Sequence, residues 1–280
     1  MKESFEPMVD RHLVQRLHQA RTEYLEAFFV PAGRGTGREV VAMGATRAFM
    51  SPHDRFKNKL ILTGHEDEAV LDALLQGYEQ RRAPCFIEIN PANFNADPLS
   101  TGRRPVTDYL VQRGFTPRYF RSVWFAESRY AELDVPRDVS LQRFGPEDLE
   151  AFARKVRGVL GKPEAEAEAF VREERLRLEQ DEGDHRWRHY IATLDGRPSA
   201  MATLFLARSA GYLVEGYTRA EARRQGLHGY LVGQRVNEAA MTGCRIVFSI
   251  THFDAASARN LQRHGFRLAY NFMTFAREHR

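Results

Sequence analysis

The sequence has few cysteines and no long apolar stretch. Its two cysteines, Cys85 and Cys244, are too few for a disulfide framework or a cysteine-based metal site. No uninterrupted apolar run is long enough for a membrane-spanning helix, and the charged segment Met1–Arg11 is not followed by the apolar core of a secretory leader. We therefore expect a cytoplasmic protein that uses no metal and no membrane.

The sequence also lacks a nucleic-acid-binding motif and a complete phosphate loop. Its net charge of +4 comes from arginines scattered along the chain, so we expect anionic ligands but no nucleic-acid partner. The glycine-rich stretch 31–37 lacks the Gly-Lys-Ser/Thr ending of a phosphate loop and is predicted to be a loop tip. His185 and His189 are four residues apart on a predicted strand, which does not place them side by side for a metal.

The stretch 217–239 carries the strongest chemical signal. An apolar strand ends near Thr218, a basic turn containing Gly226 follows, and an amphipathic helix then begins, with Leu231, Val232, Val236 and Ala239 on its apolar face. The start of a helix presents unpaired N–H groups and the positive end of the helix dipole, and a glycine lets an anion approach the backbone closely. The pattern therefore predicts a cradle for a diphosphate.

This turn resembles the acyl-CoA signature of the GNAT acetyltransferases, Arg/Gln-x-x-Gly-x-Gly/Ala. Arg223 and Gly226 match it, whereas His228 stands where Gly or Ala is usual. The later block 257–266, Ser-x-Arg-Asn before His-Gly-Phe, is similar to the second GNAT block, in which a short helix ends in Gly-Phe. The resemblance implies an α/β fold, a mixed, mostly antiparallel sheet flanked by helices, with acetyl-CoA as co-substrate.

The resemblance also implies which residues hold the cofactor. Backbone N–H groups of the turn would bind the diphosphate, and the edge of the preceding strand would bind the pantetheine arm. The candidates are Gly216, Tyr217, Thr218, Arg223, Arg224, Gln225, Gly226, Leu227, His228, Gly229, Ser257 and Asn260. Two alternatives stay open: the arginines lie on the surface, and Ser257 and Asn260 brace the short helix.

Acetyl transfer to an amine requires a proton donor for the departing thiolate. Many GNAT enzymes place a tyrosine four residues before the Gly-Phe pair, but here that residue is Leu261, which cannot donate a proton. Tyr270, Tyr217, Tyr212 or a water molecule would then act, unless the thiolate leaves unassisted. A counterpart of Tyr270 recurs in the first half of the chain, which favours a packing role for it.

The reaction also requires a base for the incoming ammonium group. Glu215 is the candidate, because it lies on the strand that leads into the cradle. Its carboxylate acts as the base if the side chain faces the thioester and is an ordinary exposed group if it faces the other way. Strand alternation leaves both orientations open.

The chain reads as two similar halves. In the first half, helices are predicted over 10–29, 66–82 and 106–113, and strands over 39–50, 59–63 and 85–90. In the second half, helices are predicted over 145–160 and 162–182, a hairpin with its turn at Asp195-Gly196, and a strand over 210–218. Leu110, Gly114, Phe115 and Tyr119 recur as Leu261, Gly265, Phe266 and Tyr270 at one constant offset. We therefore predict two tandem GNAT-like domains.

The boundaries are a degenerate domain at 1–130, a linker at 131–139 and an acetyltransferase domain at 140–280. Where the second domain has its basic turn, the first has Glu66, Asp67 and Glu68, which suit a helix start but would repel a diphosphate. The first domain is therefore predicted to be structural. Two such domains in one chain would mimic a dimer, so both a monomer and a homodimer stay open.

The resemblance thus implies an acetyl-CoA-dependent N-acyltransferase that acts by direct transfer to a small-molecule or peptide amine, which the sequence does not identify. The alternative is a catalytically impaired acyl-CoA-binding or protein-interaction module, which Leu261 supports. Nucleic-acid association through the basic surface is a third, weaker hypothesis.

Overall fold

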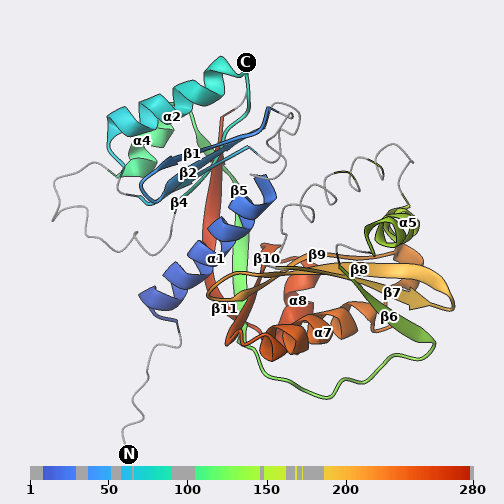
Figure 1. The fold of residues 1–280 in the computed structure, drawn as a ribbon. Coiled ribbons are helices and arrows are strands. Elements are labelled where there is room, and N and C mark those ends of the chain that lie inside the picture. The colour runs from blue at the N-terminus through green and yellow to red at the C-terminus, as the bar shows by residue number, and fades with distance from the viewer. Residues whose placement is uncertain are drawn as a thin grey trace, which may run out of the picture.

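The computed structural model describes residues 9–29, 37–51, 58–64, 66–89, 105–145, 148–161 and 186–277, with the single positions 168 and 172. The predicted helix 162–182, apart from positions 168 and 172, lies outside the described residues, as do most of the loop 31–37 and His185. The described strands form one eleven-stranded sheet, and helices pack against both of its faces (Figure 1). No described helix is long and apolar enough to cross a membrane.

We call residues 1–130 the N-terminal half. Its elements are α1 (Arg11–Phe29), β1 (Glu39–Met43), β2 (Thr46–Met50), β3 (Lys59–Leu62), α2 (Glu68–Gln80), β4 (Phe86–Ile89), α4 (Val106–Gln112) and β5 (Thr116–Glu127). The predicted single strand 39–50 is a hairpin instead. Gly44 makes its turn at φ 61°, a backbone conformation that glycine adopts without steric cost.

We call residues 139–280 the C-terminal half. Its elements are β6 (Val139–Phe144), α5 (Leu149–Leu160), β7 (Trp187–Leu194), β8 (Arg197–Leu206), β9 (Gly211–Thr218), the 3₁₀ turn η4 (Ala220–Ala222), α7 (Leu227–Met241), β10 (Ile246–His252), α8 (Ala256–Arg263) and β11 (Arg267–Ala276). The β7–β8 hairpin turns at Asp195-Gly196 as predicted, with φ of 49° and 73°.

The internal repeat is visible in the structure. α4 leads into β5 as α8 leads into β11, and Gly114 and Gly265 make the two connections at φ 80° and 78°. Leu110 and Leu261 are both buried under these helices. Each half has one parallel strand pair, β3–β4 and β9–β10, and the other ladders are antiparallel.

The two halves exchange their last strands. The sheet order is β1-β2-β3-β4-β11-β5-β10-β9-β8-β7-β6, so β5 lies beside β10 and β11 lies beside β4. β5 and β11 also pair with each other, antiparallel, at the centre of the sheet. The halves therefore share one sheet rather than holding one each, and neither can be removed without breaking strand pairs of the other.

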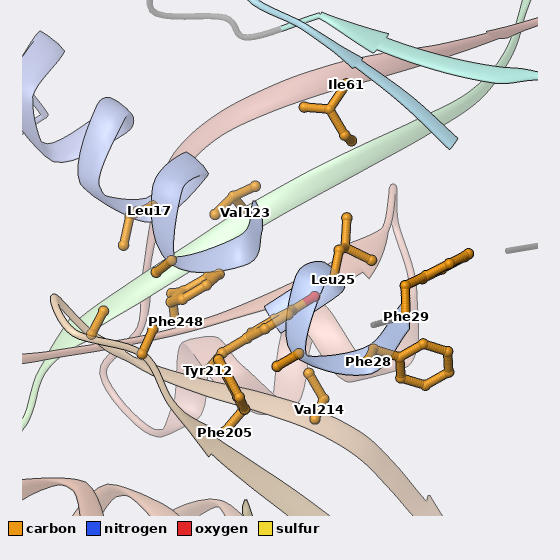
Figure 2. Packing of buried hydrophobic residues seen from close by; sticks show 14 of the residues in the cluster. Leu17, Leu25, Phe28, Phe29, Ile61, Val123, Phe205, Tyr212, Val214 and Phe248 are labelled. Carbon is orange, nitrogen blue, oxygen red and sulfur yellow. The ribbon is translucent and has the colours of Figure 1, made fainter. Parts of the chain in front are cut away.

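Helix α1 belongs to the first half in sequence but packs on both halves. Its buried face meets Ile61 of β3 as well as Phe205, Tyr212 and Val214 of β8 and β9 (Figure 2). The Glu23 carboxylate accepts a hydrogen bond from the Arg208 N–H at 3.0 Å. Two turns earlier, the Arg16 guanidinium donates to the Ser209 carbonyl at 3.0 Å. These bonds fix α1 against the β8–β9 turn.

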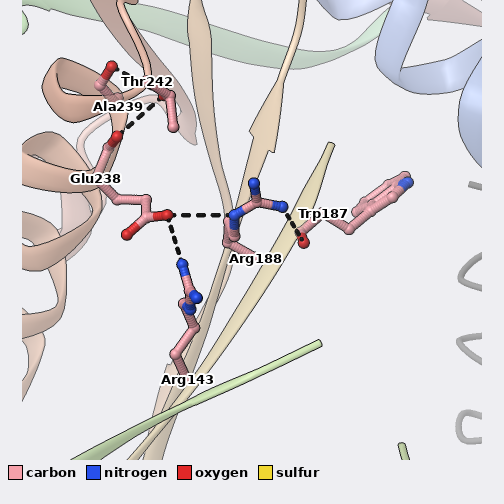
Figure 3. A network of polar contacts seen from close by, with 6 residues as sticks. All are labelled: Arg143, Trp187, Arg188, Glu238, Ala239 and Thr242. Atoms are coloured by element: carbon pink, nitrogen blue, oxygen red, sulfur yellow. Dashed lines mark hydrogen bonds and ion pairs between the residues drawn. The ribbon is translucent and has the colours of Figure 1, made fainter. Parts of the chain in front are cut away.

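Helix α7 is fixed to the edge of the sheet by a charged network. Glu238 accepts hydrogen bonds from Arg143 of β6 at 2.9 Å and from Arg188 of β7 at 3.2 Å (Figure 3). The Thr242 hydroxyl donates to the carbonyls of Glu238 and Ala239, both at 3.0 Å, and closes the helix end. The network sets where the opposite end of α7, its N-terminus, lies relative to β9.

Candidate functional site

The site is built where β9 turns into α7. Gly226 is the residue before the helix, at φ 77°, and the first helical hydrogen bond runs from the Tyr230 N–H to the Gly226 carbonyl at 3.0 Å. Within the described residues, no hydrogen bond uses the N–H groups of Leu227, His228 or Gly229. The helix therefore presents three donors and its positive dipole end at one point.

These donors border a large cavity, which we call the cradle cavity. Its volume is about 1180 Å³. The predicted cofactor residues that line it are Gly216, Tyr217, Thr218, Arg223, Arg224, Gly226, Leu227, His228, Gly229, Ser257 and Asn260. Of the candidates, only Gln225 is not among its lining residues. Asn260 also accepts a hydrogen bond from Arg263 at 3.1 Å, so it both faces the cavity and braces α8.

The predicted linker forms another wall of the cradle cavity. Residues 132–136 line it, and a Cβ placed on Gly226 would lie 3.3 Å from Pro136. The Asn237 side chain of α7 holds this segment through two hydrogen bonds with the Ala131 backbone, at 2.8 and 3.0 Å. Sequence reasoning missed this role because a charged, aperiodic segment shows no packing pattern.

A second cavity, which we call the splay cavity, continues from the first. The parallel pairing of β9 with β10 ends at the pair Leu213–Ser249, and beyond it the two strands diverge. A cavity of about 350 Å³ lies there, lined by Tyr24, Tyr212, Leu213, Val214, Glu215, Gly216, His228, Val232, Arg235, Ser249, Ile250, Thr251, Ser257 and Leu261. Gly216, His228 and Ser257 line both cavities, so the two are contiguous.

Glu215 reaches the splay cavity because of a β-bulge. Ala202 of β8 stands opposite two residues of β9, Glu215 and Gly216, and Glu215 has φ 53°. The Arg235 guanidinium supports the bulge by donating to the carbonyls of Thr203 and Val214, each at 3.2 Å. Burial lowers the pKa of Arg235 to about 10. A bulge breaks strand alternation, which is why the pattern left the direction of Glu215 open.

A buried polar chain orients the Glu215 carboxylate. The Thr203 hydroxyl donates to Glu215 Oε2 at 3.1 Å and lies 3.0 Å from His189 Nδ1. Because the hydroxyl has one proton, Nδ1 is the donor of the second bond. Thr203 and His189 are both buried. Neither was a sequence candidate, and the metal role considered for His189 does not fit a ring engaged in this way.

The tyrosines considered as proton donors are dispersed. Tyr217 lines the cradle cavity, and Tyr212 lines the splay cavity with its ring stacked on Phe248 at 4.3 Å. Tyr270 is half-buried and lines neither described cavity; burial raises its pKa, as it does that of Tyr212. Leu261 lines the splay cavity, as the tyrosine usual at its position would.

Two histidines stand beside the helix N-terminus. A Cβ on Gly229 would lie 2.6 Å from His264 Nε2, which explains the glycine there. Burial, with Arg235 and His264 nearby, lowers the pKa of His228 to about 4, and burial also lowers that of His264. Both imidazoles are therefore neutral at pH 7. The described residues provide no hydrogen-bond partner for His228 Nδ1.

In the N-terminal half, side chains bind the backbone of the corresponding turn. The Glu66 carboxylate accepts hydrogen bonds from the N–H groups of Thr63 at 2.6 Å and Gly64 at 3.0 Å, and from the Thr63 hydroxyl at 2.8 Å. Asp67 caps α2 by accepting from the Val70 N–H at 2.9 Å. A side-chain carboxylate thus occupies the turn where the C-terminal half has an open cavity.

The described residues contain no group of three His, Cys, Asp or Glu side chains placed to hold a metal. Cys85 and Cys244 are free and half-buried, and burial raises the pKa of both thiols. Nothing in this geometry gives them a part in the site.

Comparison with known proteins gives the fold. No family model and no curated protein matches the sequence. Among solved structures, a tandem GNAT protein from the clavulanic acid biosynthesis pathway matches with a TM-score of 0.63 at 14% identity, covering 95% of this chain and 94% of its own. A GCN5-related N-acetyltransferase from Kribbella flavida matches with a TM-score of 0.61 at 16% identity, covering 91% and 96%. The chain has the GNAT fold.

A third GNAT structure, from Sphaerobacter thermophilus, agrees, with a TM-score of 0.58 at 14% identity over 84% of this chain and 76% of its own. The matches extend over both halves, so the likeness includes the tandem arrangement and not only one GNAT unit. At these identities the likeness concerns the fold; what the site does is argued from its own residues.

Proposed function

We propose that the C-terminal half binds acetyl-CoA and transfers its acyl group to an amine. One observation carries the proposal: three N–H groups at the start of α7, which form no hydrogen bond within the described residues, open onto a cavity that continues into a second one containing a carboxylate. A diphosphate fits the first part, an extended arm fits the gap between β9 and β10, and the reacting carbonyl then lies beside Glu215.

The residues present suit this cofactor. Arg223, Arg224 and Arg263 line the cradle cavity beside the helix N-terminus, so cations and backbone donors converge on one anionic group. The diverging strands leave β9 backbone groups beyond Val214 for the amides of a pantetheine arm. Acetyl-CoA supplies the activated thioester, and the chain binds and orients it.

Glu215 is the proposed base. The incoming ammonium loses a proton to this carboxylate, and the free amine can then attack the thioester carbonyl. Thr203 and His189 hold the carboxylate in one orientation by hydrogen bonds. A base fixed in this way keeps its lone pair directed at the acceptor instead of pairing with solvent.

The N-terminal half is not proposed to bind a second acyl-CoA, because Glu66 already fills its turn and would repel a diphosphate. The acceptor is a small-molecule or peptide amine. The protein acts as a monomer or a homodimer in the cytoplasm. The alternative is an acyl-CoA-binding module without turnover; Leu261, at the position of the usual acid, favours it.

The test is release of free CoA from acetyl-CoA by the purified full chain, in the presence of a panel of primary amines and peptides. We expect at least one amine to raise the release rate, and Glu215→Gln to lower it without changing acetyl-CoA binding. Binding without release under any condition would favour the module. Release unaffected by Glu215→Gln would contradict the role of that residue.

A further inference from the structure

We propose that His228, at the start of α7, donates a hydrogen bond from its Nε2–H group to the sulfur of acetyl-CoA as the thiolate departs. The proposal rests on the function proposed above and adds a catalytic residue to it. Gly or Ala is usual at this position of the signature, so the imidazole is a feature of this chain. It gives the site a donor on the side where Leu261 provides none.

The first support is that His228 lies where the two cavities join. Among the described residues, Gly216, His228 and Ser257 line both the cradle cavity and the splay cavity. A cofactor with its diphosphate in the cradle cavity and its thioester beside Glu215 must pass through this junction. A Cβ placed on Gly216 would lie 3.8 Å from His228 Nε2, so this ring nitrogen approaches the strand along which the pantetheine arm extends.

The second support is that His228 and Glu215 approach the splay cavity from opposite faces of the sheet. Glu215 lies on the α1 face, because the polar chain that orients it ends at His189, whose ring is parallel to that of Trp187 in the core under α1. Helices α7 and α8 cover the other face, and they carry His228 and Leu261 (Figure 1). The base therefore lies on the side of the incoming amine, and His228 on the side where the usual acid would lie.

The third support is the position of the proton on the ring. Burial, with Arg235 and His264 nearby, holds the pKa of His228 at about 4, so the imidazole is neutral at pH 7 and has one N–H group. Nδ1 is a buried atom without a hydrogen-bond partner within the described residues. An N–H group buried without an acceptor loses its hydrogen bond to water, so the proton belongs on Nε2, the nitrogen beside the cofactor path.

Two other donor side chains on α7 and α8 line the splay cavity, Arg235 and Ser257. Arg235 is buried, and its guanidinium donates to carbonyls of α7, β8 and β9, which commits it to holding the helix against the bulge. Ser257 is therefore the competing donor on this face, and its substitution distinguishes the two.

The acyl transfer needs no further reactant. The amine nitrogen forms a bond to the thioester carbonyl carbon, and its excess proton passes to Glu215. When the intermediate collapses, the carbon–sulfur bond breaks and its electron pair stays on the sulfur, as a thiolate that accepts the hydrogen bond from His228 Nε2–H. The thiolate takes a proton from water as CoA leaves, Glu215 returns its proton to water, and His228 keeps its own throughout.

The test compares variants of His228 with and without a side-chain donor in the full chain at pH 7.5. Free-CoA release from acetyl-CoA is measured with the best amine or, in its absence, with water. His228→Leu fills the space of the ring without a donor, and His228→Ala introduces a residue usual at this position. We expect both to lower kcat by about 10- to 100-fold, the effect of one hydrogen bond to a charged group, with an unchanged dissociation constant for acetyl-CoA.

A conservative variant separates chemistry from packing. The side-chain amide of His228→Gln can place an N–H group where the ring has Nε2, so this variant should retain most of kcat. The control His252→Leu, at an exposed histidine that lines neither cavity, should match the unaltered protein.

The outcomes distinguish this role from the proposed function. Unchanged kcat in His228→Ala and His228→Leu, an equal loss in His228→Gln, or a larger loss in Ser257→Ala overturns the role of His228, while amine-dependent release by the unaltered protein still supports acyl transfer. An unaltered protein that binds acetyl-CoA but releases no CoA with any amine or water overturns both proposals.

Discussion

Arg21 of α1 forms an ion pair with Glu88 of β4, and their side chains are only 7% and 1% exposed. Lys59 joins the pair at 3.1 Å. Burial alone would raise the pKa of Glu88, but Arg21, Lys59 and Arg121 hold it at about 2. One turn further along α1, Tyr24 faces the splay cavity. The ion pair therefore ties a helix that lines the splay cavity to the N-terminal half.

Removing the Glu88 charge should destabilise the protein strongly. Glu88→Gln leaves Arg21 and Lys59 buried without their counter-ion, and breaking a buried pair in this way costs about 3–5 kcal/mol. Urea unfolding at pH 7 measures the loss. The control Glu39→Gln breaks the exposed pair with Arg81 and should cost less than about 1 kcal/mol. Equal effects of the two substitutions would contradict a buried charge at Glu88.

Glu88 should also make the folding stability of the protein sensitive to acid. Its folded pKa, about 2, lies below the ordinary value of 4.5, so the unfolded chain binds the proton first as the pH falls. The stability that the group contributes is complete above about pH 4.5 and is lost between pH 4.5 and pH 2. Unfolding at pH 7, 4 and 3 should show this decline in the unaltered protein and a shallower one in Glu88→Gln.

Glu66→Ala should destabilise the N-terminal half without creating a cofactor site. It leaves the Thr63 and Gly64 N–H groups without their acceptor, at a cost of about 2–3 kcal/mol. Asp67 and Glu68 still repel a diphosphate there, so acetyl-CoA should bind with one-to-one stoichiometry as before. Titration calorimetry and urea unfolding measure the two effects, with Glu68→Ala as control. A second bound acetyl-CoA would show that Glu66 alone blocks the site.

Acetyl-CoA affinity should rise as the pH falls. His228 is neutral in the free protein, with a pKa of about 4. The charged or titratable groups that line the same cavities include the basic His264, Arg235 and Arg263 and the acidic Glu132 and Asp134. A bound diphosphate favours protonated imidazole and raises its pKa, so binding takes up a proton below about pH 6.5. Calorimetry at pH 7.5 and 5.5 should show tighter binding at the lower pH.

The matched variant for this dependence is His228→Asn, which keeps a polar side chain that does not titrate. Its affinity should vary less with pH than that of the unaltered protein. Affinity that falls on acidification in the unaltered protein would show that the histidines do not face the anion. Without ligand, acidification has the opposite effect on folding stability. Because the pKa of His228 is lower in the folded protein than in the unfolded chain, stability is lost as the pH falls from about 6.5 to about 4.

Local patterns predicted the turn and helix start at Gly226 and the repeat, because each depends on residues adjacent in sequence. Gly226 before an amphipathic helix, and Gly114 and Gly265 after short ones, are such signals. The exchange of β5 and β11 depends instead on pairing between strands more than a hundred residues apart, for which no local pattern exists. The pattern likewise predicts the helix 10–29, but the packing of this helix on the C-terminal half is not encoded near it.

The proposed function depends most directly on acetyl-CoA occupying the cradle cavity, and thermal unfolding with and without excess acetyl-CoA tests this. At about 100 times its dissociation constant the ligand should add roughly 2.7 kcal/mol to stability and raise the midpoint. Gly226→Asp places a carboxylate in the cradle and should abolish the shift, whereas Gly196→Asp, at a turn glycine of similar φ with open space around it, should keep it. No shift in the unaltered protein, or an equal shift in Gly226→Asp, would contradict acetyl-CoA binding in the cradle cavity.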